Sequence, residues 1–137
     1  MRTMLAAAAV LAGSGMDASM SGAEARAYGI EYFGVREVGG YKIPSGQLAH
    51  LIEGKGFRID TDGANFGVAG NLCEPSVRFT YGNGAVRVDG NVHRGCSAVG
   101  QWKYSMNRNV PRGSACAELW AQNWTRFVAK QCHYVHD

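Results

Sequence analysis

The chain has 137 residues, a length that suits a single domain, and its formal net charge of +3 is too small to define a partner by itself. Glycine is abundant, with 19 residues. Apolar residues recur at a spacing of two far more often than at the helical spacing of 3.6. These features predict strands joined by tight turns, and therefore an all-β domain.

The first 27 residues predict a secretory signal peptide. Arg2 supplies an early positive charge, residues 4–13 form an uncharged run rich in Leu, Ala and Val, and residues 25–27 (Ala-Arg-Ala) fit a cleavage site. The apolar run is about half the roughly 20 residues that a membrane-spanning helix needs, so we expect no transmembrane segment. We predict a secreted domain over residues 28–137, with cleavage after Ala23 as the alternative.

The first predicted hairpin turns at Gly39-Gly40, since paired glycines tolerate the positive φ angles of a tight turn. This turn sets Glu37 opposite Lys42. It also places Phe33 and Val35 on one face of the hairpin.

Residues 48–53 predict a further strand, with a short helix as the open alternative. A turn at Asp62-Gly63 predicts the next hairpin, in which Ile59 pairs with Phe66. Residues 60–65 superficially match a calcium loop, but the Gly comes too early and a later Glu is missing. A plain Asp-Gly turn is the preferred interpretation.

The clearest hairpin turns at Asn83-Gly84, a strong two-residue turn signal. It predicts one apolar face and one face with an opposite-charge pair, as a half-buried hairpin requires. Its register pairs Phe79 with Val88, Tyr81 with Val86, Arg78 with Asp89 and Thr80 with Arg87.

The C-terminal segment is compatible with two structures. Residues 114–124 suit either one or two helical turns or a strand. In the second case the chain turns at Gln122-Asn123 and returns as a strand over residues 125–135. We favour the two strands.

An even number of cysteines behind a signal peptide predicts two disulfides. The cysteines are Cys73, Cys96, Cys116 and Cys132. Extending the Asn83-Gly84 hairpin backwards puts the first two on its inner face, diagonally offset, and a bulge near Pro75 would bring them within bonding distance. The last two then pair across the C-terminal hairpin. The other two connectivities remain open.

Short motifs surround the last two cysteines, at residues 112–117 (RGSACA) and 129–133 (AKQCH). With residues 65–66 (NF) and 71–73 (NLC), they resemble uncharacterised small secreted two-disulfide proteins of actinobacteria. The resemblance covers most of the predicted mature chain. It implies a secreted bacterial β domain and no particular function.

A charge asymmetry carries the functional prediction. Residues 90–117 contain no Asp or Glu, yet they hold cations and aromatic rings in alternation. The candidate binding residues are Arg94, Trp102, Lys103, Tyr104, Arg108 and Arg112. Such a stretch suits an anionic polymer such as nucleic acid or teichoic acid, or anionic lipid headgroups, because cations meet the charged groups while rings stack. The simpler interpretation is a solvated loop with Trp102 in the core.

Metal, cofactor and catalytic motifs are weak. His133 and His136 lie three apart, so on a strand they point to opposite faces, and oxidised cysteines cannot ligate zinc. The sequence has no phosphate-binding loop and no serine-hydrolase or zinc-protease motif, so we expect no metal and no cofactor.

We therefore predict an antiparallel β-sandwich or partly closed barrel with two disulfides. Its predicted role is that of a secreted, non-catalytic binding module or effector for an anionic envelope polymer or an extracellular protein. One alternative is a small secreted hydrolase or nuclease, for which His93, His133, Glu118 and Arg94 supply suitable chemical groups. Another is a protease inhibitor with a loop over residues 110–113.

Overall fold

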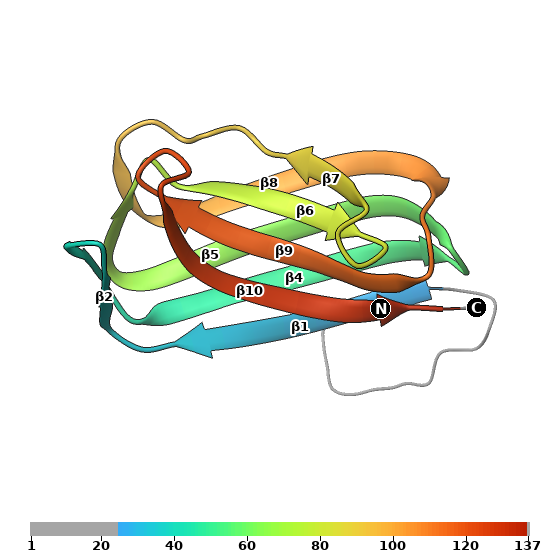
Figure 1. Ribbon diagram of the computed structural model, residues 1–137, viewed down its shortest axis with the longest axis horizontal. Helices are drawn as coiled ribbons and strands as arrows, with labels where there is room; N and C mark the ends of the chain where they lie inside the picture. The colour runs from blue at the N-terminus through green and yellow to red at the C-terminus, as the bar shows by residue number, and fades with distance from the viewer. Residues whose placement is uncertain (1–24, 137) are drawn as a thin grey trace.

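The computed structural model describes residues 25–136, which form ten β-strands and no helix. The strands pair antiparallel into two four-stranded sheets and one two-stranded ribbon, and the two sheets stack as the layers of a sandwich (Figure 1). The predicted all-β fold is confirmed. Nothing in residues 25–136 is a helix long and apolar enough to span a membrane.

The first sheet has the order β1-β4-β5-β8 and the second has the order β10-β9-β6-β7. The first sheet comprises β1 (Ala25–Phe33), β4 (Gly46–Lys55), β5 (Arg58–Cys73) and β8 (Cys96–Asn109). The second comprises β6 (Ser76–Tyr81), β7 (Val86–Asp89), β9 (Gly113–Ala121) and β10 (Arg126–Val135). The ribbon pairs β2 (Arg36–Val38) with β3 (Tyr41–Ile43).

The core lies between the two sheets, because alternate side chains of each strand point into that space. In β6, for example, Val77, Phe79 and Tyr81 are fully buried. The first sheet contributes Leu48, Ile52, Ile59, Ala64, Phe66, Leu72, Trp102 and Met106 to the same cluster. Burying each large aliphatic or aromatic side chain stabilises the fold by about 1.5–3 kcal/mol before the entropy of ordering is counted.

The hairpin at Asn83-Gly84 has the predicted register in all four pairs. Both turn residues adopt positive φ, at 58° and 93°. On the outer face Arg78 Nε lies 2.7 Å from Asp89 Oδ1. Local turn chemistry and strand alternation agree here, and together they determine the structure.

The glycine turn at residues 39–40 also forms, and it sets Glu37 opposite Lys42 as predicted. The shared face predicted for Phe33 and Val35 is wrong. Phe33 ends β1 and packs against the core, whereas Val35 lies between β1 and β2 and is 59% exposed.

The predicted hairpin at Asp62-Gly63 is wrong. β5 runs through this point as one strand, and the turn lies earlier, at Gly56, whose φ is +59°. Two partner strands bond β5, one on each side, and Asp62 finds buried hydrogen-bond partners. Those tertiary contacts outweigh the local turn preference of an Asp-Gly pair.

The other strand predictions are confirmed. Residues 48–53 lie within β4, and the C-terminal segment forms the hairpin of β9 and β10 rather than helical turns. The predicted leader falls largely outside the described residues. Since β1 begins at Ala25, cleavage before Tyr28 removes three residues of that strand, whereas cleavage after Ala23 leaves it whole.

Both predicted disulfides are present, Cys73–Cys96 and Cys116–Cys132. Each joins residues directly opposite on neighbouring strands, with Cα atoms 3.9 Å and 4.1 Å apart. The first bond links β5 to β8, so it is not an extension of the β6–β7 hairpin. Cys96 is exposed, and the inner, diagonally offset arrangement predicted for that pair is wrong.

Candidate functional site

The edge strands β7 and β8 border a pocket of about 320 Å³. Three of the six predicted binding residues, Trp102, Lys103 and Tyr104, line it, and they are consecutive on the edge strand β8. His93 and Asp89 approach from the β7 side of the pocket. The structure thus gathers half of the predicted set around one concavity at the open edge of the sandwich.

Trp102 is the anchor of this edge. Strand alternation turns its ring inward, so the side chain is only 6% exposed and contacts Phe66. Its indole Nε1 donates to the Asn91 carbonyl at 2.7 Å, and the His93 ring stacks on it with centroids 4.1 Å apart. Trp102 therefore belongs to the core and fixes the loop after β7, and it contributes a wall to the pocket rather than a free stacking surface.

The predicted cations are spread along β8 instead of gathered at one point. Lys103 points outward from the middle of the strand, Arg94 precedes it in an exposed loop, and Arg108 is exposed near its far end. A strand of 14 residues is about 45 Å long. Arg112 lies beyond that end, with its guanidinium 5.7 Å from the centre of the Phe57 ring.

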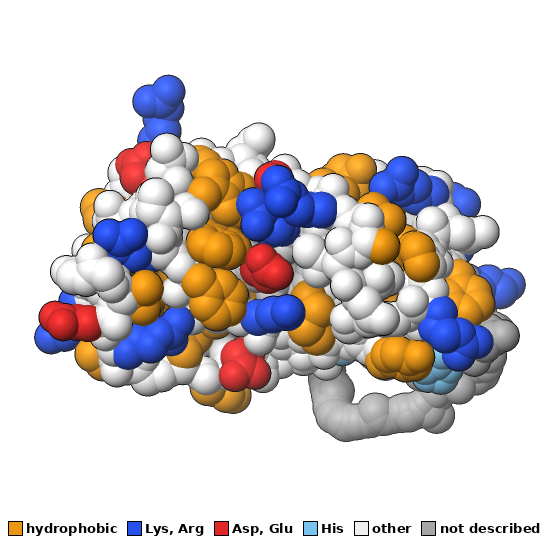
Figure 2. Space-filling view, in the orientation of Figure 1, with side chains coloured by type: hydrophobic (Ala, Val, Ile, Leu, Met, Phe, Trp, Pro, Cys, Tyr) orange, Lys and Arg blue, Asp and Glu red, His pale blue; other side chains and the backbone are white. Residues whose placement is uncertain are grey.

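The carboxylate in the pocket does not cancel these cations. Asp89 Oδ1 accepts from Arg78 Nε at 2.7 Å, and its Oδ2 lies 3.3 Å from Arg87 NH2. Its negative charge is therefore engaged on the outer face of the second sheet. In the view of Figure 2 charged side chains of both signs are interspersed with apolar ones, so the small net charge does not build one large field there.

A second polar cluster, which the sequence did not predict, lies between the sheets. His50, Asp62 and Tyr81 are each 0% exposed. His50 Nε2 lies 2.6 Å from Asp62 Oδ1, and the Tyr81 hydroxyl donates to Asp62 Oδ2 at 2.7 Å. Each group comes from a different strand, so no local sequence pattern announces the cluster.

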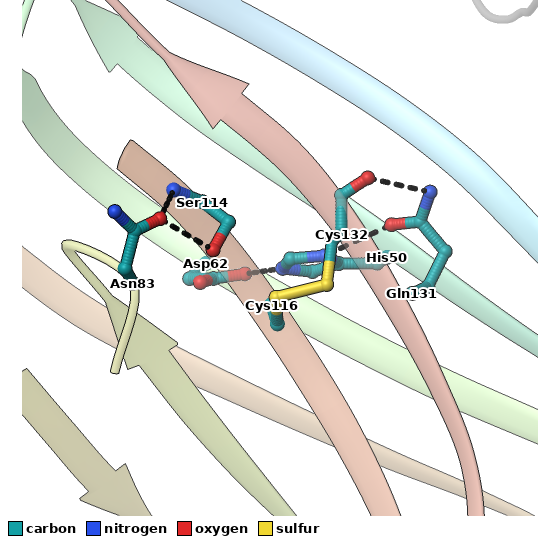
Figure 3. Close-up of a disulfide and its surroundings, with 7 residues drawn as sticks. All are labelled: His50, Asp62, Asn83, Ser114, Cys116, Gln131 and Cys132. Atoms are coloured by element: carbon teal, nitrogen blue, oxygen red, sulfur yellow. Dashed lines mark hydrogen bonds and ion pairs between the residues drawn. A yellow bond between two sulfur atoms is a disulfide. The ribbon is translucent and has the colours of Figure 1, made fainter. Parts of the chain in front are cut away.

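Hydrogen bonds at both ring nitrogens fix the position of His50. Figure 3 shows Asp62 and Gln131 at opposite ends of the His50 ring, beside the Cys116–Cys132 disulfide. Gln131 Nε2 donates to the Cys132 carbonyl, so the amide presents its oxygen to His50 Nδ1, at 3.1 Å. Both ring nitrogens of His50 therefore face oxygen atoms, and these two contacts hold the ring between the two sheets.

Neighbouring groups respond to this buried pair. Burial, followed by the charge of His50, lowers the pKa of His133 from 6.5 to about 4. Burial and the Asp62 carboxylate raise the pKa of the Tyr81 phenol well above its usual range. His133 is therefore neutral at physiological pH, and Tyr81 keeps its proton as a hydrogen-bond donor.

The buried cluster is structural rather than catalytic. A catalytic His-Asp pair has to reach a substrate, and both of these side chains are sealed from solvent. Their role is to tie β4 and β5 of the first sheet to β6 and β10 of the second. The tyrosine hydroxyl, the amide oxygen and the carboxylate satisfy groups that would otherwise be costly to bury.

The residues that suited a hydrolase do not meet. His93 stacks at the β7–β8 edge, His133 lies inside beside His50, and Glu118 accepts from Trp120 on the outer face of β9. Arg94 is exposed in its loop. Between Ala25 and His136, no three His, Cys, Asp or Glu side chains group as a metal site would need.

The loop considered for protease inhibition is held against the end of the sandwich. Val110 is 5% exposed and its N–H donates to the Phe57 carbonyl at 2.9 Å. Gly113 is buried, and the next residue, Ser114, donates its N–H to Asn83 Oδ1 at 2.8 Å. Only the two middle residues are exposed, which is a short projection for a protease-binding loop.

The chain matches no protein-family model, no curated protein and no solved structure.

Proposed function

We propose that the protein is a secreted, non-catalytic binding module that holds an anionic polymer along its edge strand β8. The observation that carries the proposal is the alignment of Arg94, Lys103 and Arg108 along one open edge, with a pocket at its middle. Two disulfides favour an oxidising compartment, in line with the predicted leader.

The spacing of the cations suits an extended ligand. A single exposed ion pair contributes about 0–1 kcal/mol, so a small anion gains little from any one of these side chains. A polymer carrying repeated charges gains from all of them at once and releases its counterions. Lys and Arg on an edge strand also discourage strand-to-strand aggregation, and that role alone is the competing account of these residues.

The pocket adds a place for one unit of the polymer. Tyr104 and the edge of Trp102 supply aromatic wall, and Lys103 stands at the rim. The ordered loop of Asn91 and His93 closes the other side. A ligand group that enters here is expected to change the fluorescence of Trp102.

The test is a salt series of binding to inorganic polyphosphate and to RNA, followed by tryptophan fluorescence. Lys103→Ala and Arg108→Ala should each weaken binding and flatten its salt dependence, by a slope change of about 0.7 per lost contact with single-stranded RNA. Lys42→Ala and Lys130→Ala, which remove exposed lysines from β3 and β10, are the matched controls.

Equal effects of test and control variants would show that net charge, and not the β8 edge, governs binding. No binding of either polymer at low salt would overturn the proposal. RNA that is cut during the assay would instead support a nuclease.

A further inference from the structure

The outer face of the first sheet carries a second concavity. It has a volume of about 170 Å³ and lies on the far side of β8 from the core. The strand register places its residues in rows across the sheet, with Tyr28, Leu51, Gly63 and Lys103 in one row. Ala49, Asn65 and Gln101 form the next row.

The walls of this concavity combine rings and amides. Tyr28, on β1, is 58% exposed and lines the concavity. Asn65 and Gln101 project opposite it, and Lys103 provides one cation. Glu53, which accepts from Thr61 Oγ1 at 3.3 Å, provides one carboxylate that can accept from sugar hydroxyls. Side-chain amides both donate and accept hydrogen bonds, as sugar hydroxyls do, and tyrosine rings present flat apolar faces with a polar tip.

The floor is low because β5 has a glycine, Gly63, at an outward position of the concavity, and Gly67, beyond the lining, is a second outward glycine of the same strand. Neither has positive φ. A Cβ at Gly63 would meet only the Trp102 carbonyl, at 3.6 Å, and one at Gly67 would meet nothing within 4 Å. The inward-facing Gly100 differs, because a Cβ there would lie 2.5 Å from the Phe66 ring. The packing of the core requires a glycine at position 100, whereas the space above Gly63 and Gly67 is open on the outer face of the sheet and can admit a ligand.

We propose that this concavity binds a sugar unit of an acidic polysaccharide, with the acidic groups of the chain on Lys103 and the β8 edge. The proposal rests on the proposed function and names its polymer, because Gln101 and Lys103 line both pockets and join them across β8. A nucleic acid fits this face less well. It needs a cation for each phosphate, but among the described residues Lys103 is the only Lys or Arg that lines the concavity.

The test compares polygalacturonate, the neutral glycan dextran and inorganic polyphosphate as probes of the full-length, disulfide-bonded chain. Gly63→Val fills the floor, and Gly34→Val, at an open position between β1 and β2, is its matched control. We expect Gly63→Val to weaken polygalacturonate binding about tenfold or more and to change polyphosphate binding less than about twofold. Lys103→Ala should weaken the binding of both.

Unchanged polygalacturonate affinity in Gly63→Val would overturn this inference and leave the proposed function standing. Binding of polyphosphate but not of polygalacturonate would overturn it in the same way. Failure of both polymers to bind would remove the proposed function itself. If Gly63→Val unfolds, Tyr28→Ala replaces it, since that exposed ring contributes to the wall without supporting the core. Equal affinity for dextran would show that the acidic groups play no part.

Discussion

Replacing Asp62 with Ala should destabilise this protein more than any other loss of a single carboxylate in the part of the chain described. The Asp62 carboxylate is 0% exposed and accepts hydrogen bonds from His50 and Tyr81. Asp60, two residues earlier on the same strand, is the matched control. It pairs with Arg58 at 2.8 Å, and both side chains are 49% exposed.

The expected loss of stability follows from the buried polar groups that Asp62→Ala leaves without a hydrogen-bond partner. In Asp62→Ala the buried His50 ring and the buried Tyr81 hydroxyl both lose their hydrogen-bond partner, at about 1–3 kcal/mol each. We therefore expect a loss of about 2–6 kcal/mol in the free energy of unfolding. Asp60→Ala removes an exposed ion pair and should cost less than about 1 kcal/mol.

Urea unfolding of the disulfide-intact protein, followed by tryptophan fluorescence, measures both free energies of unfolding. The Asp62 variant should also melt about 10–25 °C lower. Asp62→Asn keeps the shape and removes the charge, so its loss should fall between the other two. If the Asp62→Ala and Asp60→Ala variants differ by less than about 0.5 kcal/mol, the buried hydrogen bonds of Asp62 do not hold the sheets together.

Three further predictions concern the same region. Stability should fall as the pH drops from 6.5 to about 4, because His133 takes up a proton in the unfolded chain over that range but, with its lowered pKa, stays neutral in the folded protein. The expected loss is at most about 3 kcal/mol. Urea titrations of His133→Gln should show no such loss. Gly29→Ala should cost about 1–3 kcal/mol, since its Cβ would collide with the Gln131 amide, and Gln131→Ala should relieve part of that cost in a double-mutant cycle. The Cys116–Cys132 bond joins residues with a sequence separation of 16, and its removal should lower the free energy of unfolding by about 3 kcal/mol. An unchanged melting temperature in thermal unfolding would refute this estimate.

Sequence reasoning succeeded where local chemistry and strand alternation agree. The register around Asn83-Gly84 followed from turn preference and from the apolar positions Phe79 and Tyr81 alone. The same reasoning failed at Asp62-Gly63. This pair is an equally strong turn signal, but it lies inside β5, which is hydrogen-bonded to β4 on one side and to β8 on the other. Information about those neighbours is not contained in the local segment.

The binding role of the predicted site residues stays a prediction, and three of them, Trp102, Lys103 and Tyr104, line one pocket. The sequence left open whether Trp102 stacks on a ligand or lies in the core, and its side chain is buried. The alternation of Trp102, Tyr104 and Met106 with polar residues is itself a signal of a half-buried strand, and it indicates that Trp102 points inward. The His50 cluster gave no such signal, since its members come together only when both sheets have formed.

The bond between His50 and Gln131 spans 81 residues, and β1 lies against β10 near the two ends of the domain. Closing so long a loop is slow and entropically costly, so this seam is expected to close late in folding. Until β10 pairs with β9, His50 and Asp62 lie at the open side of a partial sandwich. A chain that stops before β10 therefore exposes these two side chains to water and the open sandwich to proteases. The native state forms only when the last strand has been added.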